Sequence, residues 1–246
     1  MDWWTLIDIP IEIWRIGNIR GLARELRSAT TMFSDSFSGD LPNHENYNGE
    51  SHKTAIFMQG FFANAIYYRR FIEFFYEHHV RVVCPLRLSR NIISYREAHE
   101  LLSRTIKSVE DETGEPPILI GHSKGGTDII GVLGEHPEIK KAYPVAPPLR
   151  GSSLNSLNVV INFMHHNPGV PIDHDILTDE DITRKITTFC SYSDRIVPPH
   201  EAMVHGAENK IVIDGDHGLW NSHTGLPYHA RHEILERITN NSRKAA

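Results

Sequence analysis

The hydrophobic pattern from residue 53 onwards alternates between short apolar runs and longer stretches with apolar residues at helical spacing. The short runs predict strands over 54–58, 81–84, 117–120, 142–145, 186–190 and 210–213. The longer stretches predict helices over 63–78, 95–113, 125–136 and 229–238. Strands that alternate with helices are typical of βαβ units. The pattern therefore predicts an α/β fold, with a mostly parallel sheet covered by helices on both faces.

Two segments do not fit this alternation. Residues 1–50 predict an N-terminal helix followed by a polar loop, because apolar residues recur at helical spacing over 3–27. That helix either packs on the main domain or lies at a lipid surface with its tryptophans. The connection over 147–185 is longer than an ordinary crossover, which favours a lid or cap over the sheet edge, or a crossover helix with a surface loop. Since no repeat or linker divides the chain, we expect residues 1–246 to form a single domain.

Composition narrows the class of protein. The 246 residues are 40% hydrophobic and 23% charged, which excludes a disordered chain and a bundle of membrane helices. The formal net charge of −6 argues against a nucleic-acid partner. Since we find no secretory signal and no apolar run long enough to cross a bilayer, we expect a cytoplasmic protein. The stretch 165–175 is rich in His and Asp but matches no standard ligand spacing, so we expect no metal site.

Residues 121–125, Gly-His-Ser-Lys-Gly, match the G-x-S-x-G pattern. The motif directly follows the predicted strand 117–120 and precedes a predicted helix, which is the context of a nucleophile elbow. In such an elbow Gly121 and Gly125 leave room where a Cβ atom would clash. Ser123 then stands above the carboxyl edge of the sheet, and we predict that it is a catalytic nucleophile.

A serine nucleophile needs a base, and the base needs an acid that orients it. Asp194 and His217 each follow a predicted strand, so both lie at carboxyl ends of strands and in the order Ser, Asp, His. Asp179 and Asp181 precede their strand and are worse placed. His223 is an alternative base if the last strand is longer than predicted.

Acyl transfer also needs hydrogen-bond donors for the oxyanion. One donor is predicted to be the backbone N–H of Lys124, the residue after the nucleophile. The other is predicted to be the backbone N–H of Phe61, because residues 58–62 form the loop after the first strand of the alternating region. Further candidates for the substrate pocket are Gln59, Phe62 and His122.

These motifs resemble those of the α/β-hydrolase superfamily, and specifically of small bacterial lipases and esterases. The matching segments are Gln59-Gly60-Phe61, Gly-His-Ser-Lys-Gly-Gly over 121–126, Tyr-Ser-Asp-Arg-Ile-Val over 192–197 and Gly-Asp-His-Gly-Leu over 215–219. The separation of 23 residues between Asp194 and His217 is similar to the spacing in minimal lipases. The family usually has His where this chain has Gln59, and an apolar residue or Gln where it has Lys124. The donor at both places is a backbone N–H, so the chemistry is retained.

The resemblance implies a sheet with the strand order 4-3-5-6-7-8 in the family's numbering. In that order Cys84 lies on an edge strand and Cys190 lies four strands away, at about 19 Å for neighbouring strands ~4.8 Å apart, so the two cannot form a disulfide. The resemblance also implies hydrolysis of carboxylic esters without a cofactor. The implied partners are a small-molecule ester or lipid substrate and, at the periphery of a membrane, a lipid interface.

The leading hypothesis is a serine hydrolase that cleaves carboxylic esters, as an esterase or lipase, through an acyl-enzyme and a triad of Ser123, His217 and Asp194. Two alternatives stay open. One keeps the triad and transfers the acyl group elsewhere, as an amidase, thioesterase or acyltransferase. The other is a non-catalytic relative that binds a ligand or partner. The complete set of three residues argues against that second alternative, because binding alone has no need of all three.

Overall fold

The computed structural model describes residues 53–87, 89–149, 177–194, 196–212, 217 and 226–243. Within these ranges the chain forms a parallel sheet with the strand order β2-β1-β3-β4-β5-β6. The strands are β1 Lys53–Met58, β2 Val80–Val83, β3 Ile118–His122, β4 Ala142–Val145, β5 Thr187–Ser191 and β6 Glu208–Val212. This is the order that the resemblance implied, with β1 in the place of the family's third strand. The prediction of a mostly parallel α/β sheet is confirmed.

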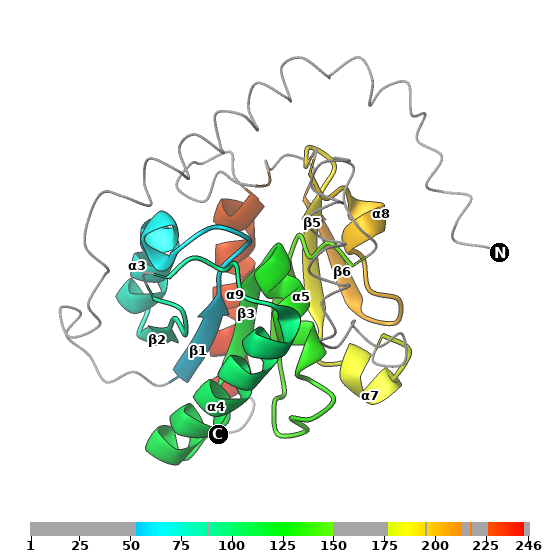
Figure 1. Ribbon diagram of the computed structural model, residues 1–246. Coiled ribbons are helices and arrows are strands. Elements are labelled where there is room, and N and C mark those ends of the chain that lie inside the picture. Colours follow the sequence, from blue (N-terminus) through cyan, green and yellow to red (C-terminus); the bar gives the residue numbers. More distant parts are fainter. Residues whose placement is uncertain are drawn as a thin grey trace, which may run out of the picture.

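Helices cover both faces of the sheet (Figure 1). They are α3 Arg69–Glu77, α4 Tyr95–Thr113, α5 Lys124–Gly131, α7 Glu180–Thr183, α8 Pro199–Ala202 and α9 Leu226–Arg243, with a 3₁₀ turn over Ala65–Tyr68. Helices α4 and α5 pack on one face, and α3 and α9 pack on the other. Side chains of β1 alternate between the two cores, since Ala55 and Phe57 lie with α3 and α9, whereas Ile56 and Met58 lie with α4 and α5.

Helix α4 has the bounds that the apolar pattern predicted, because signals for both of its ends are present in the sequence. The Ser94 side chain accepts a hydrogen bond from the Glu97 backbone, and the Glu97 side chain accepts one from the Ser94 backbone. At the other end Gly114 adopts a left-handed conformation with φ 73°, which stops the helix. The helix begins and ends where this local chemistry requires.

The structure differs from the predicted helices in four places. One is α9, predicted over 229–238, which extends over Leu226–Arg243. The helix predicted over 125–136 ends at Gly131. After it, the backbone N–H groups of Leu133 and Glu135 bond to carbonyls three residues back. The helix predicted over 63–78 is divided into the 3₁₀ turn and α3. The four-residue helices α7 and α8 are too short to show an apolar period and were not predicted.

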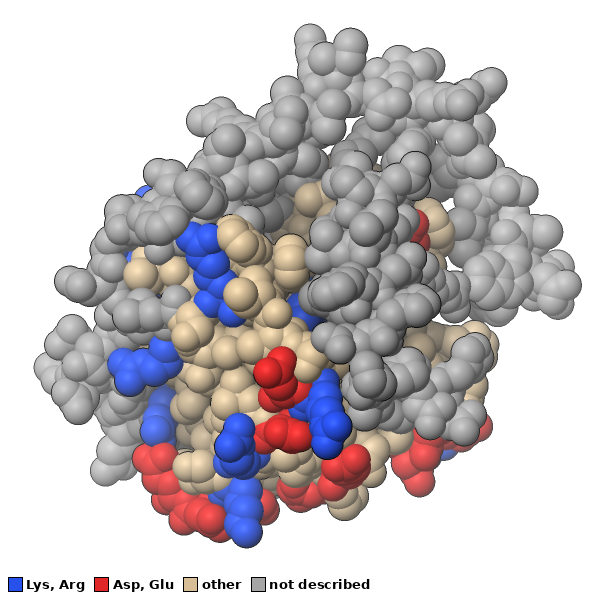
Figure 2. All heavy atoms as spheres, viewed as in Figure 1, with Lys and Arg blue, Asp and Glu red and all other residues tan. Residues whose placement is uncertain are grey.

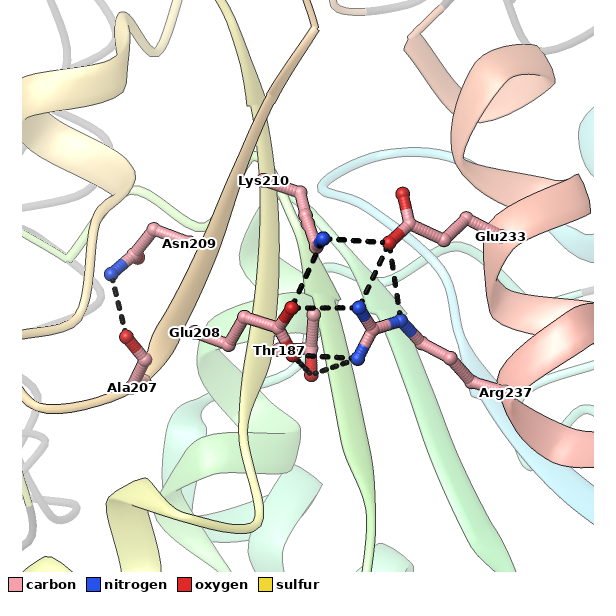
Figure 3. Close-up of polar contacts among 7 residues, drawn as sticks. All are labelled: Thr187, Ala207, Glu208, Asn209, Lys210, Glu233 and Arg237. Carbon is pink, nitrogen blue, oxygen red and sulfur yellow. Dashed lines mark hydrogen bonds and ion pairs between the residues drawn. The ribbon is translucent and has the colours of Figure 1, made fainter. Parts of the chain in front are cut away.

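An ion cluster joins β6, at the edge of the described sheet, to α9 (Figure 3). The Arg237 guanidinium contacts both carboxylate oxygens of Glu208, at 2.6 and 2.7 Å. The Lys210 ammonium lies 3.0 Å from Glu208 and 3.1 Å from Glu233. Hydrogen bonds from Arg237 lower the pKa of Glu208 to about 2. The cluster therefore links α9 to β6, the strand that precedes His217 in the chain.

Charged side chains on the face shown in Figure 2 are of both signs, and many of them lie along α4. Two ion pairs involve residues of α4: Arg81 with Glu112, and Arg96 with Glu100. Within the described ranges, no helix combines the length and the apolar composition needed to cross a membrane.

Several predicted segments lie outside the described residues. They include the N-terminal helix over 3–27, most of the insertion over 147–185, the stretch 165–175 and the alternative base His223. Cys84 follows the edge strand β2 and Cys190 lies in β5, with β1, β3 and β4 in the same sheet. Both thiols are free, as expected from that separation.

Candidate active site

Ser123 lies in a sharp turn between β3 and α5, at the carboxyl edge of the sheet. Its backbone has φ 51° and ψ −123°, a positive-φ conformation that residues with a side chain rarely adopt. The Ser123 N–H donates to the Val145 carbonyl at 2.8 Å, and the Ser123 carbonyl accepts from Gly126 at 2.9 Å and Thr127 at 3.2 Å. Hydrogen bonds to a neighbouring strand and to the helix therefore hold the turn.

Glycines allow this turn to pack against the loop that follows β1. A Cβ atom at Gly125 would collide with the carbonyl oxygen of Met58, and one at Gly121 would collide with the carbonyl oxygen of Gly125. The loop itself approaches the serine closely, since a Cβ atom at Gly60 would lie 3.3 Å from Ser123 Cβ. The backbone of the loop that contains the predicted oxyanion donor therefore lies beside Ser123.

Asp194 and His217 are brought together by the loops after β5 and β6. His217 Nδ1 lies 2.7 Å from Asp194 Oδ2, and both side chains are buried. Asp194 Oδ1 accepts backbone N–H groups from Ile196 at 2.9 Å and Val197 at 2.8 Å, which fixes the orientation of the carboxylate. Because a carboxylate only accepts, Nδ1 carries the proton and Nε2 is the nitrogen that can act as a base.

His122 is next to the nucleophile in the sequence, and its ring packs against the ring of the base. It immediately precedes Ser123, and its ring centroid lies 4.7 Å from that of His217. The Tyr68 hydroxyl lies 2.9 Å from His122 Nδ1 and accepts the Gly60 N–H at 2.9 Å. Burial, with a further contribution from His217, lowers the pKa of His122 well below its ordinary value. His122 is therefore a neutral ring at physiological pH, packed between the base and the loop after β1.

The two predicted oxyanion donors are available within the described part of the chain. The backbone N–H groups of Phe61 and Lys124 donate to no described residue, whereas the N–H of Gly60 is bonded to Tyr68. Lys124 is the first residue of α5, where N–H groups lack helical acceptors and the helix dipole favours negative charge. Both N–H groups lie on the segments that meet at Ser123.

One contact of the predicted triad is not present in the structure. Ser123 Oγ makes no hydrogen bond to a described residue, so its contact with His217 stays a prediction. Catalytic hydrogen bonds of this kind often tighten only when substrate binds. Of the carboxylates considered, Asp179 caps α7 before β5, and Asp181 is exposed on that helix. Neither takes the position that Asp194 takes beside His217.

A second Ser–His–carboxylate chain lies away from this site. Ser103 Oγ is 2.9 Å from His136 Nε2, and His136 Nδ1 is 2.6 Å from Glu138 Oε1. Ser103 lies in the middle of α4, where backbone N–H groups are used by the helix itself. It therefore has no neighbouring donors for an oxyanion, and Ser123 is the better nucleophile.

Sequence reasoning missed three polar residues around the predicted site: Tyr68, Asn91 and Asp128. Lys124 and Asp128 are four residues apart on a helix, which is a signal for an ion pair, but nothing in the sequence marks Asn91. Among the pocket candidates, Gln59 is fully buried and its side-chain amide donates to a backbone carbonyl. Phe62 has φ 61° and lies under the guanidinium of an arginine, 4.3 Å from its ring centroid. Their roles in a pocket stay predictions.

No protein-family profile matches the sequence, and no curated protein is significantly similar to it. Solved structures do match. A monoacylglycerol lipase of Paleococcus ferrophilus aligns with a TM-score of 0.56 and 15% identity over 78% of this chain and 96% of its own. A monoglyceride lipase variant of Saccharomyces cerevisiae aligns with a TM-score of 0.55 and 11% identity over 79% and 88%. MGS-MChE2, from the metagenome of lagoon sediments of Mar Chica, aligns with a TM-score of 0.56 and 16% identity over 78% and 93%.

MGS-MChE2 is described as an α/β-hydrolase enzyme, and the other two structures are lipases. Together with the observed strand order, these matches define the class: the chain has the α/β-hydrolase fold. At such low identity the likeness concerns the fold. The chemistry that a chain with this fold performs depends on the residues of its site.

Proposed function

We propose that the protein is a serine hydrolase that cleaves carboxylic esters through an acyl-enzyme. The observation that carries the proposal is the 2.7 Å contact between His217 and Asp194 at the sheet edge where Ser123 occupies its positive-φ turn. A base oriented by a buried carboxylate, at the same sheet edge as a serine in a strained turn and two unused backbone donors, is the arrangement that acyl transfer requires. A protein that only binds a ligand needs no oriented base next to a serine and two backbone donors.

The residues act in two half-reactions. Ser123 Oγ attacks the ester carbonyl carbon while its proton passes to His217 Nε2, and the negative charge on the carbonyl oxygen is stabilised by the N–H groups of Phe61 and Lys124. Asp194 stabilises the imidazolium. His217 then protonates the leaving alcohol as the C–O bond breaks, which forms the acyl-enzyme. Water repeats the sequence, with His217 as its base, and releases the carboxylic acid and free Ser123.

Names of the compared structures support a choice of first substrates. Two of them are a monoacylglycerol lipase and a monoglyceride lipase, so we propose glycerol esters with one acyl chain as candidates. A series of p-nitrophenyl esters of increasing chain length measures how much of the acyl chain the site accepts. Activity that rises sharply at a lipid interface would support the lid or cap predicted over 147–185.

The central test is Ser123→Ala, assayed on the best ester of that series. We expect kcat to fall about 10⁴-fold or more with no loss of thermal stability, because only the nucleophilic oxygen is removed. A fluorophosphonate probe should label Ser123 of the wild-type protein, as mapped by peptide mass spectrometry. Ser103→Ala is the matched control, since Ser103 also bonds a histidine, and it should keep full activity and labelling.

Three outcomes contradict the proposal. An active Ser123→Ala enzyme would exclude Ser123 as the nucleophile. Labelling that moves to Ser103 would place the chemistry on α4 instead. Hydrolysis of amides or thioesters much faster than of matched esters would replace the ester assignment by one of the other acyl-transfer classes.

A further inference from the structure

The side chain of Lys124 enters a buried polar cluster on the helix that begins after Ser123. Its ammonium lies 2.9 Å from both carboxylate oxygens of Asp128, one turn further along α5, and 3.0 Å from Asn91 Oδ1. Asn91 Nδ2 in turn donates to Asp128 Oδ2 at 3.1 Å. The Tyr95 ring covers the ammonium at 4.9 Å, and the Lys124 side chain is only 2% exposed. A closed, water-excluded set of three side chains results.

Asn91 links this set to the loop that contains the proposed oxyanion donor. Its Nδ2 also donates to the Gln59 carbonyl oxygen at 2.6 Å. Its backbone carbonyl accepts the Phe62 N–H at 3.2 Å, and its own N–H donates to the Ala63 carbonyl at 3.1 Å. Asn91 therefore holds the beginning of the loop with its side chain and the end of the loop with its backbone.

These contacts orient the peptide groups on either side of the donor. The peptide between Gln59 and Gly60 is bonded at both ends, its carbonyl to Asn91 and its N–H to the Tyr68 hydroxyl. The next peptide contains the Phe61 N–H, and its carbonyl, which belongs to Gly60, is also bonded. The direction of the Phe61 N–H thus depends on how Asn91 fixes the preceding peptide.

The chemistry of the cluster is unusual for a purely structural role. Burial raises the pKa of the Asp128 carboxyl, and Lys124 and Asn91 oppose that shift. Desolvating two charges costs about as much as their attraction returns, so an apolar pair of similar volume would stabilise α5 equally well. An apolar pair could not form the hydrogen bonds that Lys124 and Asp128 make to the two ends of the Asn91 amide.

We propose that Asn91 is a positioning residue for the hydrolysis, held by the Lys124–Asp128 pair so that the Phe61 and Lys124 N–H groups keep the separation that an oxyanion needs. The inference rests on the proposed function. It differs from that function because Asn91 touches no reacting atom. It acts by coupling α5, which supplies one donor, to the loop that supplies the other.

Asn91→Ala tests the inference through steady-state kinetics on the chosen ester. Since removal of a whole oxyanion donor costs about 10²–10³ in kcat, we expect misdirection of one to lower kcat about 10- to 100-fold. KM should change less than about twofold, because the ground-state ester makes little use of these donors. The inhibition constant of an alkyl boronic acid, which forms a tetrahedral adduct with the serine, should rise by the same factor as kcat/KM falls.

Asn209→Ala is the matched control. Asn209 also uses its side chain in three hydrogen bonds, to Val204 twice and to Ala207, but these hold a turn before β6 (Figure 3 shows the bond to Ala207). The variant should lose thermal stability and keep the wild-type kcat. A loss of stability alone therefore does not produce the kinetic signature expected for Asn91.

The double variant Lys124→Met, Asp128→Leu tests the same inference without shortening Asn91. It replaces the ion pair by apolar side chains of similar size but leaves the buried Asn91 Oδ1 without its donor, so we expect some loss of thermal stability, as in the Asn209→Ala control, and a fall in kcat as in Asn91→Ala. Wild-type kcat in either variant, or a rise in KM at unchanged kcat, would overturn the inference. Ser123→Ala distinguishes failure of the inference from failure of the proposed function. If Ser123→Ala is inactive while Asn91→Ala and the double variant have wild-type kcat, only the inference fails. If Ser123→Ala is active, the proposed function fails as well.

Discussion

Replacing Asp194 by Asn tests the orientation of the base with little change in shape. Asp194 Oδ1 accepts two backbone N–H groups and Oδ2 accepts the His217 ring N–H. An Asn side chain keeps its oxygen on the two backbone donors, which places its NH₂ group opposite His217 Nδ1. Two donors cannot face each other, so the imidazole must carry its proton on Nε2 instead. In that tautomer His217 cannot accept the proton of Ser123.

The magnitude follows from this change of tautomer. A Ser–His–Asp triad whose acid is changed to the amide loses about 10⁴ in kcat, which is about 5.4 kcal/mol at 1.36 kcal/mol per factor of ten. The cost to folding is smaller, because two of the three hydrogen bonds of the carboxylate survive and the third is replaced by a neutral bond from the new amide to His217 Nδ1. The cost is therefore below the value of about 1.5–3 kcal/mol for complete loss of one hydrogen bond to a charged group. Asp194→Asn should therefore be folded at room temperature and almost inactive.

The assay is ester hydrolysis at saturating substrate, with thermal unfolding measured on the same preparation. Asp181→Asn is the control, since its carboxylate is 91% exposed and lies 3.7 Å from its nearest cationic partner, Arg184. It should retain the wild-type kcat and melting temperature. A folded Asp194→Asn protein with kcat within about tenfold of wild type would refute the assignment of His217 and Asp194 as a catalytic pair.

Three further predictions concern other parts of the site and fold. His217→Ala should lose activity as completely as a variant without the nucleophile, whereas His223→Ala should keep a substantial rate in the same ester assay; the reverse result would move the base to His223. Gly125→Ala should lower the free energy of unfolding by about 3 kcal/mol or more in urea titrations, because its Cβ meets a backbone carbonyl that cannot move aside, and a melting curve like that of wild type would contradict this packing. Arg237→Met should reduce stability at pH 6, and the difference from wild type should vanish as the pH falls from about 4.3, the ordinary value for Glu, towards the pKa of about 2 that Glu208 has in the fold. A difference that stays constant over this range would show that Arg237 acts through packing and not through the charge of Glu208.

The sequence predicted well those helices and strands whose ends are set by nearby residues. The strand over 142–145 has the predicted bounds, and it ends where Ala146 adopts a positive φ of 47°. The helix over 95–113 has the predicted bounds because a capping box and a left-handed glycine terminate it. The helix predicted over 125–136 was too long, since its apolar residues continue into a turn of tighter hydrogen bonds after Gly131.

Catalytic candidates were predictable for a related reason. Parallel strands end at one edge, so a residue just after a strand is placed there by topology alone, and this is how Asp194 and His217 could be paired. Asn91 could not be found in this way. Its role arises from Gln59 and the Lys124–Asp128 pair, which lie in separate segments and meet only in the folded chain. Nothing in the sequence marks Tyr68 either, because its hydroxyl contacts to Gly60 and His122 arise only in the folded chain.

The positive φ of Ser123 has a consequence for selection on this sequence. A residue with a side chain in such a conformation costs about 1–3 kcal/mol, while a domain of ordinary stability has only about 5–15 kcal/mol in total. Glycine adopts the conformation without that cost. A lineage selected for robustness alone would therefore drift away from serine at this position and gain tolerance to heat and to other mutations. Under selection for stability alone, we therefore expect glycine to replace serine at this position before the fold itself changes.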